Sequence, residues 1–149
     1  MKFKKHFFIF LCIGLSAFAF SQETAIEAIT IKGAKKTKVS FIKSLLTTKI
    51  GQVVDSTSLE NDIILLKRLP AIGHAYYQVF YSHKNLYKVF IYIEENFTII
   101  PEVNLWTTTN NVFSYKLGIY DYNFLGRNIT FGGFYQFNGF DTYAVNFKA

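Results

Sequence analysis

Residues 113–137 read FSYKLGIYDYNFLGRNITFGGFYQF, and this stretch decides the fold of the second half of the chain. From Phe113 to Ile119, large apolar residues alternate with smaller or more polar ones, which is the period of a strand with two different faces. The same alternation returns from Ile129 to Phe137, after Asn, Gly and Arg at 123–128 indicate a turn. The stretch therefore predicts two antiparallel strands joined by a turn.

Two further alternating stretches flank this pair. Residues 100–106 precede a turn-like run of Thr and Asn, and residues 142–148 follow Asn138-Gly139, a strong hairpin signal. Alternating segments of about ten residues are typical of transmembrane β-strands. A soluble β-sandwich has the same period, but the scarce charge and abundant aromatic residues favour the membrane. We expect residues 98–149 to be the N-terminal part of an outer-membrane β-barrel, which needs further strands because open edges leave backbone groups unsatisfied in lipid.

The upstream unit, residues 22–97, has a mixed pattern. The run before Gly33 is β-branched, two helical periodicities follow, and Pro70 stops the second. The strand near Tyr87–Glu94 is apolar at nearly every position, as a central strand with both faces covered would be. The run Ala75–Tyr81 is more mixed and suits an exposed edge. The predicted elements, in order, are a strand over 26–32, helices over 39–46 and 55–69, and strands over 75–81 and 87–94.

Several polar residues have structural interpretations. Asp55 is a helix cap, and Thr57 with Glu60 has the spacing of a capping box. Asp62 is expected on the solvated side of the second helix. Glu94 and Glu95 are adjacent on a strand and point to opposite faces, so they cannot act as an acid/base pair.

Nothing in the chain predicts a catalytic or metal site, and we expect neither an enzyme nor a cofactor. His74 and His83 do not have the spacing of metal ligands. The single cysteine, Cys12, lies in a leader, residues 1–21, with a basic start and an apolar run too short for a membrane helix. We expect this signal peptide to be cleaved after Ser21. The mature chain then has 13 basic and 10 acidic residues, which gives no reason to expect nucleic acid as a partner.

One set of residues runs through the upstream unit in this order: Ile29–Gly33, Thr37, Gly51, Asp55, Leu59, Asp62, Leu66, Leu69 and Ile93–Glu95. In their joint order and spacing, the upstream unit resembles a POTRA domain of the BamA/TamA superfamily of outer-membrane assembly factors. One departure is Ala34, where an Asn often follows the glycine. The segment Asp121–Asn128 looks like the D-x-N-x-x-G-R-N/G turn found early in the barrels of the same superfamily. The resemblance implies an α+β POTRA-like domain (β-α-α-β-β) followed by the first antiparallel strands of a transmembrane β-barrel.

The resemblance also implies a function in outer-membrane protein assembly or translocation, with the N-terminal domain in the periplasm. The implied partners are unfolded outer-membrane or secreted client polypeptides, periplasmic accessory proteins and outer-membrane lipid. Two alternatives remain at this point: a dedicated secretion pore for one partner, and a soluble secreted β-rich binding protein. The candidate client-binding edge is Tyr77, Gln78, Val79, Phe80 and Tyr81. The candidate edge of the first barrel strand, where client strands would pair, is Val103, Leu105 and Trp106. The family-motif turn is Asp121, Asn123, Gly126, Arg127 and Asn128.

Overall fold

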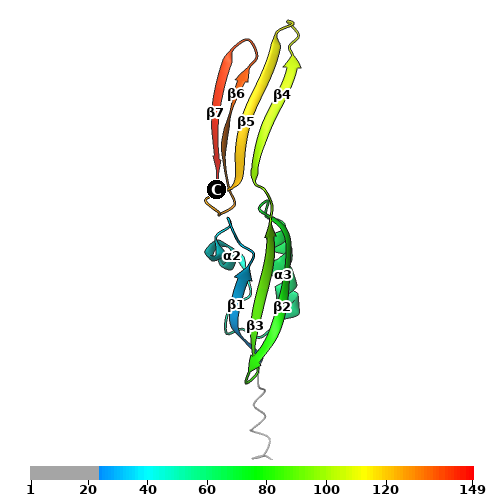
Figure 1. Ribbon diagram of the computed structural model, residues 1–149, viewed down its shortest axis with the longest axis vertical. Coiled ribbons are helices and arrows are strands. Elements are labelled where there is room, and N and C mark those ends of the chain that lie inside the picture. The colour runs from blue at the N-terminus through cyan, green and yellow to red at the C-terminus, as the bar shows by residue number, and fades with distance from the viewer. Residues whose placement is uncertain (1–23) are drawn as a thin grey trace, which may run out of the picture.

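The computed structural model describes residues 24–149, which form two β-sheets placed end to end along the long axis of the molecule (Figure 1). The predicted signal peptide lies outside the described residues. Within residues 24–149, no helix combines the length and the hydropathy needed to cross a membrane. The elements in chain order are β1 (Ala25–Lys32), α2 (Val39–Leu45), α3 (Ser56–Lys67), β2 (Ile72–His83), β3 (Leu86–Glu95), β4 (Ile99–Thr107), β5 (Phe113–Phe124), β6 (Ile129–Phe137) and β7 (Asp141–Lys148).

The first sheet has the strand order β1-β3-β2 and confirms the predicted β-α-α-β-β sequence of elements. Its central strand, β3, runs parallel to β1 and antiparallel to β2. Val89, Ile91 and Ile93 on β3 are buried against apolar side chains of the two helices, including Ile42 and Leu66. Since alternate residues of a strand point to opposite faces, this core occupies only one face of the sheet.

The opposite face of the first sheet corrects the expectation that β3 is covered on both sides. Phe90 and Tyr92 point there and are only half-buried, because both helices pack on the other face. Aromatic neighbours cover them in part. Tyr76 stacks on Tyr92 with the ring centres 4.9 Å apart, and Phe80 meets Phe90 edge-on at 5.4 Å. The apolar residues of β3 therefore serve two surfaces: those on one face pack in the core under the helices, and those on the other face contact aromatic side chains of β2.

The start of α3 is fixed by one carboxylate. Asp55 accepts hydrogen bonds from the backbone N–H groups of Thr57 (3.1 Å) and Ser58 (2.9 Å), so it is the N-cap that its residue type predicted. The expected capping box of Thr57 and Glu60 is wrong. The helix already begins at Ser56, which places Thr57 inside its first turn.

Asp62 is buried, with 1% of its surface exposed, and not on a solvated face. Its carboxylate accepts hydrogen bonds from the Thr47 N–H (2.7 Å), the Thr47 hydroxyl (2.6 Å) and the Thr48 N–H (3.0 Å). Burial raises the pKa of Asp62, but the hydrogen bonds from Thr47 and Thr48 outweigh it, and the net pKa is lowered. The side chain thus stays charged and ties the loop after α2 to α3.

The second sheet, β4-β5-β6-β7, is antiparallel throughout and confirms the predicted meander of alternating strands. Its register places the alternating apolar residues of all four strands on the same face. The hydrophobic side chains buried among the described residues end at Ile93, so this sheet has no apolar core of its own. One face, here called the apolar face, carries Val103, Leu105, Leu117, Ile119, Phe131, Tyr143, Val145 and Phe147, all of them exposed. The opposite face carries Glu102, Asn104, Lys116, Gln136, Thr142 and Asn146.

Candidate functional site

The two sheets meet where the loop after β1 contacts the turn between β5 and β6. The backbone N–H of Lys38 donates a hydrogen bond to the carbonyl oxygen of Gly126 at 2.9 Å. Gly126 has φ +67°, and a Cβ at this position would overlap the carbonyl oxygen of Lys36. Only glycine satisfies both the backbone conformation and this close approach. The glycine of the family-motif turn is therefore required by contact with the first domain.

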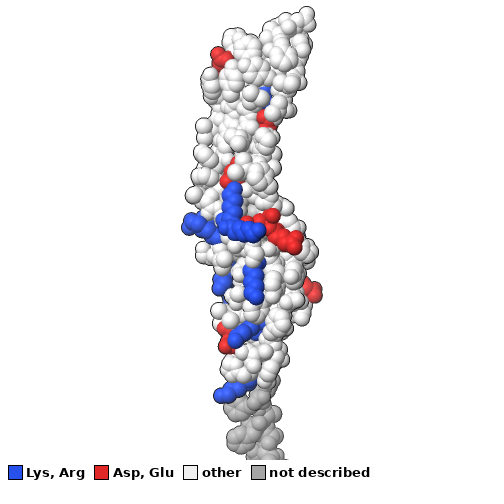
Figure 2. Space-filling model, in the orientation of Figure 1, with Lys and Arg blue, Asp and Glu red and all other residues white. Residues whose placement is uncertain are grey.

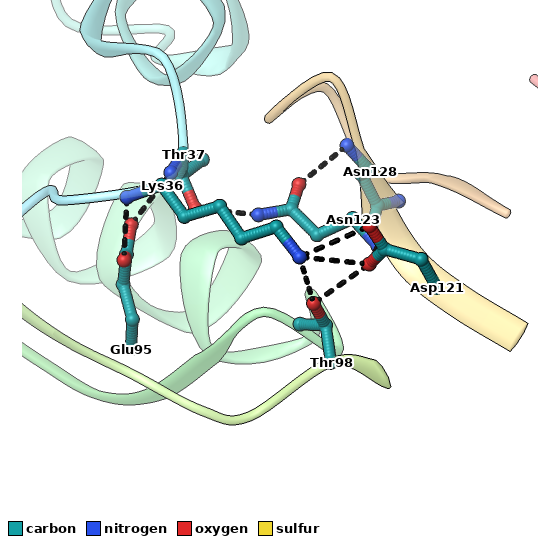
Figure 3. Close-up of polar contacts among 7 residues, drawn as sticks. All are labelled: Lys36, Thr37, Glu95, Thr98, Asp121, Asn123 and Asn128. Atoms are coloured by element: carbon teal, nitrogen blue, oxygen red, sulfur yellow. Dashed lines mark hydrogen bonds and ion pairs between the residues drawn. The ribbon is translucent and has the colours of Figure 1, made fainter. Parts of the chain in front are cut away.

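A lysine from the first domain is bound by the second sheet (Figure 3). Lys36 Nζ lies 3.0 Å and 3.1 Å from the two carboxylate oxygens of Asp121 and donates a hydrogen bond to Thr98 Oγ1 at 2.9 Å. The Thr98 hydroxyl in turn donates to Asp121 at 2.8 Å. Thr98 is buried and Asp121 is half-buried, so the ion pair is partly shielded from water. Lys36 and Asp121 thus neutralise each other, and Thr98 forms hydrogen bonds with both.

Asn123 makes a third polar contact at the junction, and it is 1% exposed. Its side-chain amide donates a hydrogen bond to the Thr37 hydroxyl oxygen at 2.9 Å, and its side-chain oxygen accepts one from the Asn128 N–H at 2.9 Å. Its own N–H donates to Asp121 at 2.9 Å. Buried polar groups are stable only when they are hydrogen-bonded, and here each partner is fixed by a different segment.

Glu95, at the end of β3, orients the loop that carries Lys36. Its two carboxylate oxygens accept hydrogen bonds from the Lys36 N–H (2.8 Å) and the Thr37 N–H (2.7 Å). Burial raises the pKa of Glu95, but these N–H donors outweigh it and the net pKa is lowered. Its neighbour Glu94 is exposed, in agreement with the expected opposite orientation. We call the set Lys36, Thr37, Glu95, Thr98, Asp121, Asn123 and Asn128 the junction network.

The junction network connects the two sheets. Its charged atoms are paired with each other or with backbone N–H groups. Residues 24–149 contain no cluster of His, Cys, Asp and Glu side chains that could hold a metal ion.

The candidate client-binding residues lie on β2, at the outer edge of the first sheet. Tyr77 and Val79 point to the core face, whereas Gln78 and Phe80 point to the face without helices. Beside this edge, a groove of about 340 Å³ separates β2 from α3. The groove is lined by Glu60, Ile63, Ile64, Lys67, Ala75, Tyr76 and Tyr77.

The other edge of the first sheet, β1, is covered at its start. The Ile26 N–H donates to the Gln52 carbonyl oxygen at 2.9 Å, and the Gly51 N–H donates to the Ile26 carbonyl oxygen at 2.8 Å. Ala25 also forms a β-bridge with Val53. A hollow of about 350 Å³ beside this edge is lined by Ile29, Lys43, Leu46, Thr48, Lys49 and Ile50. Among the described residues, β1 is thus covered at its start, whereas β2 has no strand on its outer side and borders a groove.

The candidate edge of the first barrel strand lies on β4, which has no strand on its outer side among residues 24–149. Val103 and Leu105 are on the apolar face and are 63% and 64% exposed. Trp106 pairs with Ser114 on the opposite face and is half-buried, so it does not share a surface with the other two.

The structure brings together four of the five residues of the family-motif turn: Asp121, Asn123, Gly126 and Asn128. Asp121 and Asn123 lie within β5, and the turn itself is residues 125–128. Arg127 is exposed and forms no ion pair within the part of the chain that the structure describes. The partners of the motif were missed from sequence, because Lys36 and Asp121 are 85 residues apart and no local pattern connects them.

Comparisons with known proteins find one matching family model and similar solved structures. The family model for POTRA, described as a surface antigen variable number repeat, matches residues 24–96. The crystal structure of BamA from Haemophilus ducreyi lacking POTRA domains 1–3 superposes with a TM-score of 0.70 at 18% identity, over 83% of this chain. CdiB from Acinetobacter baumannii superposes with a TM-score of 0.53 at 13% identity, over 79% of this chain. No curated protein matches the sequence.

The chain spans 23% of the length of each of these two structures. The matches extend beyond the POTRA residues and therefore include strands of the second sheet. The first sheet with its two helices has the POTRA fold, and the second has the antiparallel strands of a BamA-type barrel, not closed by β4–β7. Residues 24–96 therefore match the POTRA family model, and the fold of the chain over most of its length is similar to that of BamA and CdiB.

Proposed function

We propose that the chain belongs to an outer-membrane protein that assembles or exports other polypeptides. Its POTRA domain receives client segments in the periplasm, and β4–β7 form part of the membrane barrel. The role is one of binding and guiding, without catalysis or a cofactor. The observation that carries this proposal is the free edge of β2, which borders an apolar groove. Both belong to the domain that lies next to the barrel strands.

The exposed apolar face supports a membrane position for the second sheet. Along β5 this face presents Phe113, Tyr115, Leu117 and Ile119 before it reaches Asp121, its first charge. At about 3.4 Å per residue, Phe113 to Ile119 extends about 20 Å, and Asp121 follows at about 27 Å, so the face changes to charge near the limit of the roughly 25 Å apolar band of outer-membrane barrels. An apolar face of this extent would favour aggregation in water. The soluble alternative is therefore disfavoured.

The edge of β2 offers a client two kinds of contact. Its outward backbone N–H and C=O groups can pair with an added strand, which contributes affinity without regard to sequence. Alternate side chains of that strand would lie over the groove beside Ile63 and Ile64, which selects for alternating apolar residues. Strands of outer-membrane proteins have this alternation.

The junction network lies near the start of both free edges, β2 and β4, which supports the transfer of a client strand from β2 to β4. β2 begins opposite Glu95, and β4 begins at Ile99, so both free edges start within a few residues of the junction. A junction made of paired charges and buried hydrogen bonds keeps the two edges at a set separation. We infer that a client strand held on β2 is presented toward β4, where it can pair with the first barrel strand.

Site-specific crosslinking tests the client-binding edge. A photoreactive amino acid replaces Gln78 on β2 or, as the matched control, Thr30 on β1; both residues are exposed and lie on outer strands of the same sheet. The full chain is then illuminated with a synthetic peptide of alternating apolar and polar residues. We expect adducts at Gln78 and few at Thr30. Equal labelling of both positions, or none at Gln78, would contradict strand addition at β2.

A second peptide of the same composition in scrambled order separates strand addition from simple apolar adsorption. Pairing on an edge requires alternation, because every second side chain must face the groove. Added alternating peptide should therefore displace the bound alternating peptide, whereas added scrambled peptide should not. Displacement by both peptides would indicate a nonspecific apolar surface.

A further inference from the structure

Three basic side chains at the junction have no acidic partner. Lys35, Lys38 and Arg127 are exposed, and none forms a salt bridge within residues 24–149. The backbone hydrogen bond from Lys38 to Gly126 brings the loop of the POTRA domain beside the turn that carries Arg127. Figure 2 shows Lys and Arg side chains gathered at the level where the two sheets meet. We call Lys35, Lys38 and Arg127 the basic collar.

The acidic side chains at this level are mostly engaged elsewhere. Asp121 pairs with Lys36, and Glu95 accepts two backbone N–H groups. Glu94 is the exposed carboxylate at this end of β3, and the three cations outnumber it. Lys36 and Asp121 cancel one another in charge, whereas Glu95 keeps its negative charge. The three cations of the basic collar therefore exceed the two carboxylates, Glu94 and Glu95, by one positive charge.

The position of the basic collar coincides with the end of the apolar face. Asp121 is the first charged residue on that face of β5, and Lys36 reaches it from the POTRA domain. Two large apolar side chains flank the same level. Phe97, between β3 and β4, is 78% exposed, and Leu125, next to Gly126, is 58% exposed. Cations beside exposed apolar residues at the end of a lipid-facing band are the composition of a membrane interface.

We propose that the basic collar binds anionic phospholipid headgroups of the leaflet on the periplasmic side of the membrane. This inference rests on the proposed function, since it requires the second sheet to be in the membrane. Phe97 and Leu125 enter the boundary between headgroups and acyl chains, while the collar contacts phosphates. The interaction sets how deep the barrel lies and which side of the POTRA domain approaches the bilayer.

Vesicle flotation of the full chain tests this proposal. The chain is diluted from denaturant onto vesicles of phosphatidylcholine alone, or of equal parts phosphatidylcholine and phosphatidylglycerol. Each basic residue near an anionic surface contributes about fivefold to partitioning. Replacing the basic collar by the variant K35Q/K38Q/R127Q should weaken binding to the anionic vesicles roughly a hundredfold at low salt and leave binding to phosphatidylcholine unchanged.

A charge-matched control separates a local site from net charge. Lys49, Lys84 and Lys88 lie at the far end of the first sheet, near the β2–β3 turn and the start of β1. The variant K49Q/K84Q/K88Q has the same net charge as the collar variant. It should keep the preference for anionic vesicles. Equal losses in both variants would overturn a localised collar and indicate a general charge effect.

The outcomes distinguish the inference from the proposed function. Failure of the unaltered chain to float with either vesicle would refute the membrane position of the second sheet and the collar with it. Flotation with both vesicles, without any preference for the anionic one, would overturn the collar alone. At about 1 M salt, where the Debye length is about 3 Å, the preference should disappear while apolar binding persists.

A depth measurement gives an independent readout. Residues 22–149 contain no cysteine, so a single spin label can be placed by L125C or, in the aqueous control, by S56C on α3. In anionic vesicles the label at position 125 should be accessible to dissolved oxygen more than to a polar nickel reagent. The label at position 56 should show the reverse. A label at position 125 with fully aqueous accessibility would overturn the proposed depth.

Discussion

Asn123 of β5 donates a hydrogen bond of 2.9 Å to the hydroxyl oxygen of Thr37, a residue 86 positions earlier in the chain. Both side chains are buried, 1% and 3% exposed, although Thr37 lies in the loop between β1 and α2 and Asn123 near the end of β5. The contact exists only because the barrel strands and the POTRA domain are placed against one another. It therefore reports directly on the integrity of the junction.

Replacing Asn123 by Ala should loosen the junction. The substitution removes the donor to Thr37 and the acceptor for the Asn128 N–H, and a buried unsatisfied group costs about 1–3 kcal/mol. Hydrogen exchange of the Asn128 amide should become faster by the corresponding factor. N104A, which removes an exposed amide on β4, serves as control and should change little. Equal protection of Asn128 in both variants would refute the assigned role of Asn123.

Gly126 and Gly139 form a matched pair of turn glycines. Both have positive φ, +67° and +97°, but a Cβ on Gly139 meets no atom within 4 Å, whereas one on Gly126 overlaps the Lys36 carbonyl. Both G126A and G139A carry the cost of a left-handed backbone, about 1 kcal/mol. Only G126A should also broaden the distance distribution between spin labels on the two sheets. Identical distributions would mean that the turn does not need this close approach.

Lys36 should stabilise the folded chain through its ion pair with Asp121 rather than through its charge alone. The pair is partly exposed, with side-chain exposures of 43% and 17%, so a coupling of about 0.2–1 kcal/mol is expected. A double-mutant cycle of K36M and D121N, followed by chemical unfolding, measures it. The coupling should decrease with added salt. K35M paired with D121N should give no coupling, because Lys35 does not contact Asp121.

Asp62 should be needed for the stability of the POTRA domain. D62A leaves the N–H groups of Thr47 and Thr48 without their charged acceptor, at a cost of about 2–4 kcal/mol. Hydrogen exchange of the core amides of β3 in the full chain measures this loss. D62N should retain part of the stability because its amide oxygen can still accept. An exposed acid on the same helix, changed by E60A, should have an effect within about 0.5 kcal/mol.

The lowered pKa values of Asp62 and Glu95 also predict a pH dependence. A carboxyl group whose pKa is lower in the folded state adds stability above its unfolded value, which is near 3.8 for Asp and 4.5 for Glu. That contribution should be complete above about pH 5 and be lost as the pH falls through the folded-state values. In D62N the acid-side slope of the unfolding free energy should be smaller. An unchanged slope would contradict an ionised Asp62.

Much of the fold could be read from local patterns. Strand alternation, the helix stop at Pro70 and the hairpin signal at Asn138-Gly139 are short-range effects of backbone sterics and side-chain periodicity, and they predicted every strand and helix of residues 24–149 in order. The boundaries moved by a few residues. β2 extends to His83 because it pairs with β3 along its whole length, which a local pattern does not reveal.

Two of the errors, on Asp62 and on β3, share one physical cause. Asp62 was expected in water, and β3 was expected to be covered on both faces, because a sequence gives residue types and periods but not which neighbours occupy each side. The loop residues Thr47 and Thr48 bury Asp62, and both helices pack on the same face of the sheet. Burial is a property of the assembled chain, so it is decided by packing.

The sequence alone therefore determined the two units, their strand order along the chain and the apolar alternation that points to lipid. Only the tertiary structure decided what the family-motif turn is for. Asp121, Asn123 and Gly126 are held by Lys36, Thr37 and the loop backbone, some 85 residues away. Such contacts depend on how two sheets meet, and no local preference of the chain encodes that meeting.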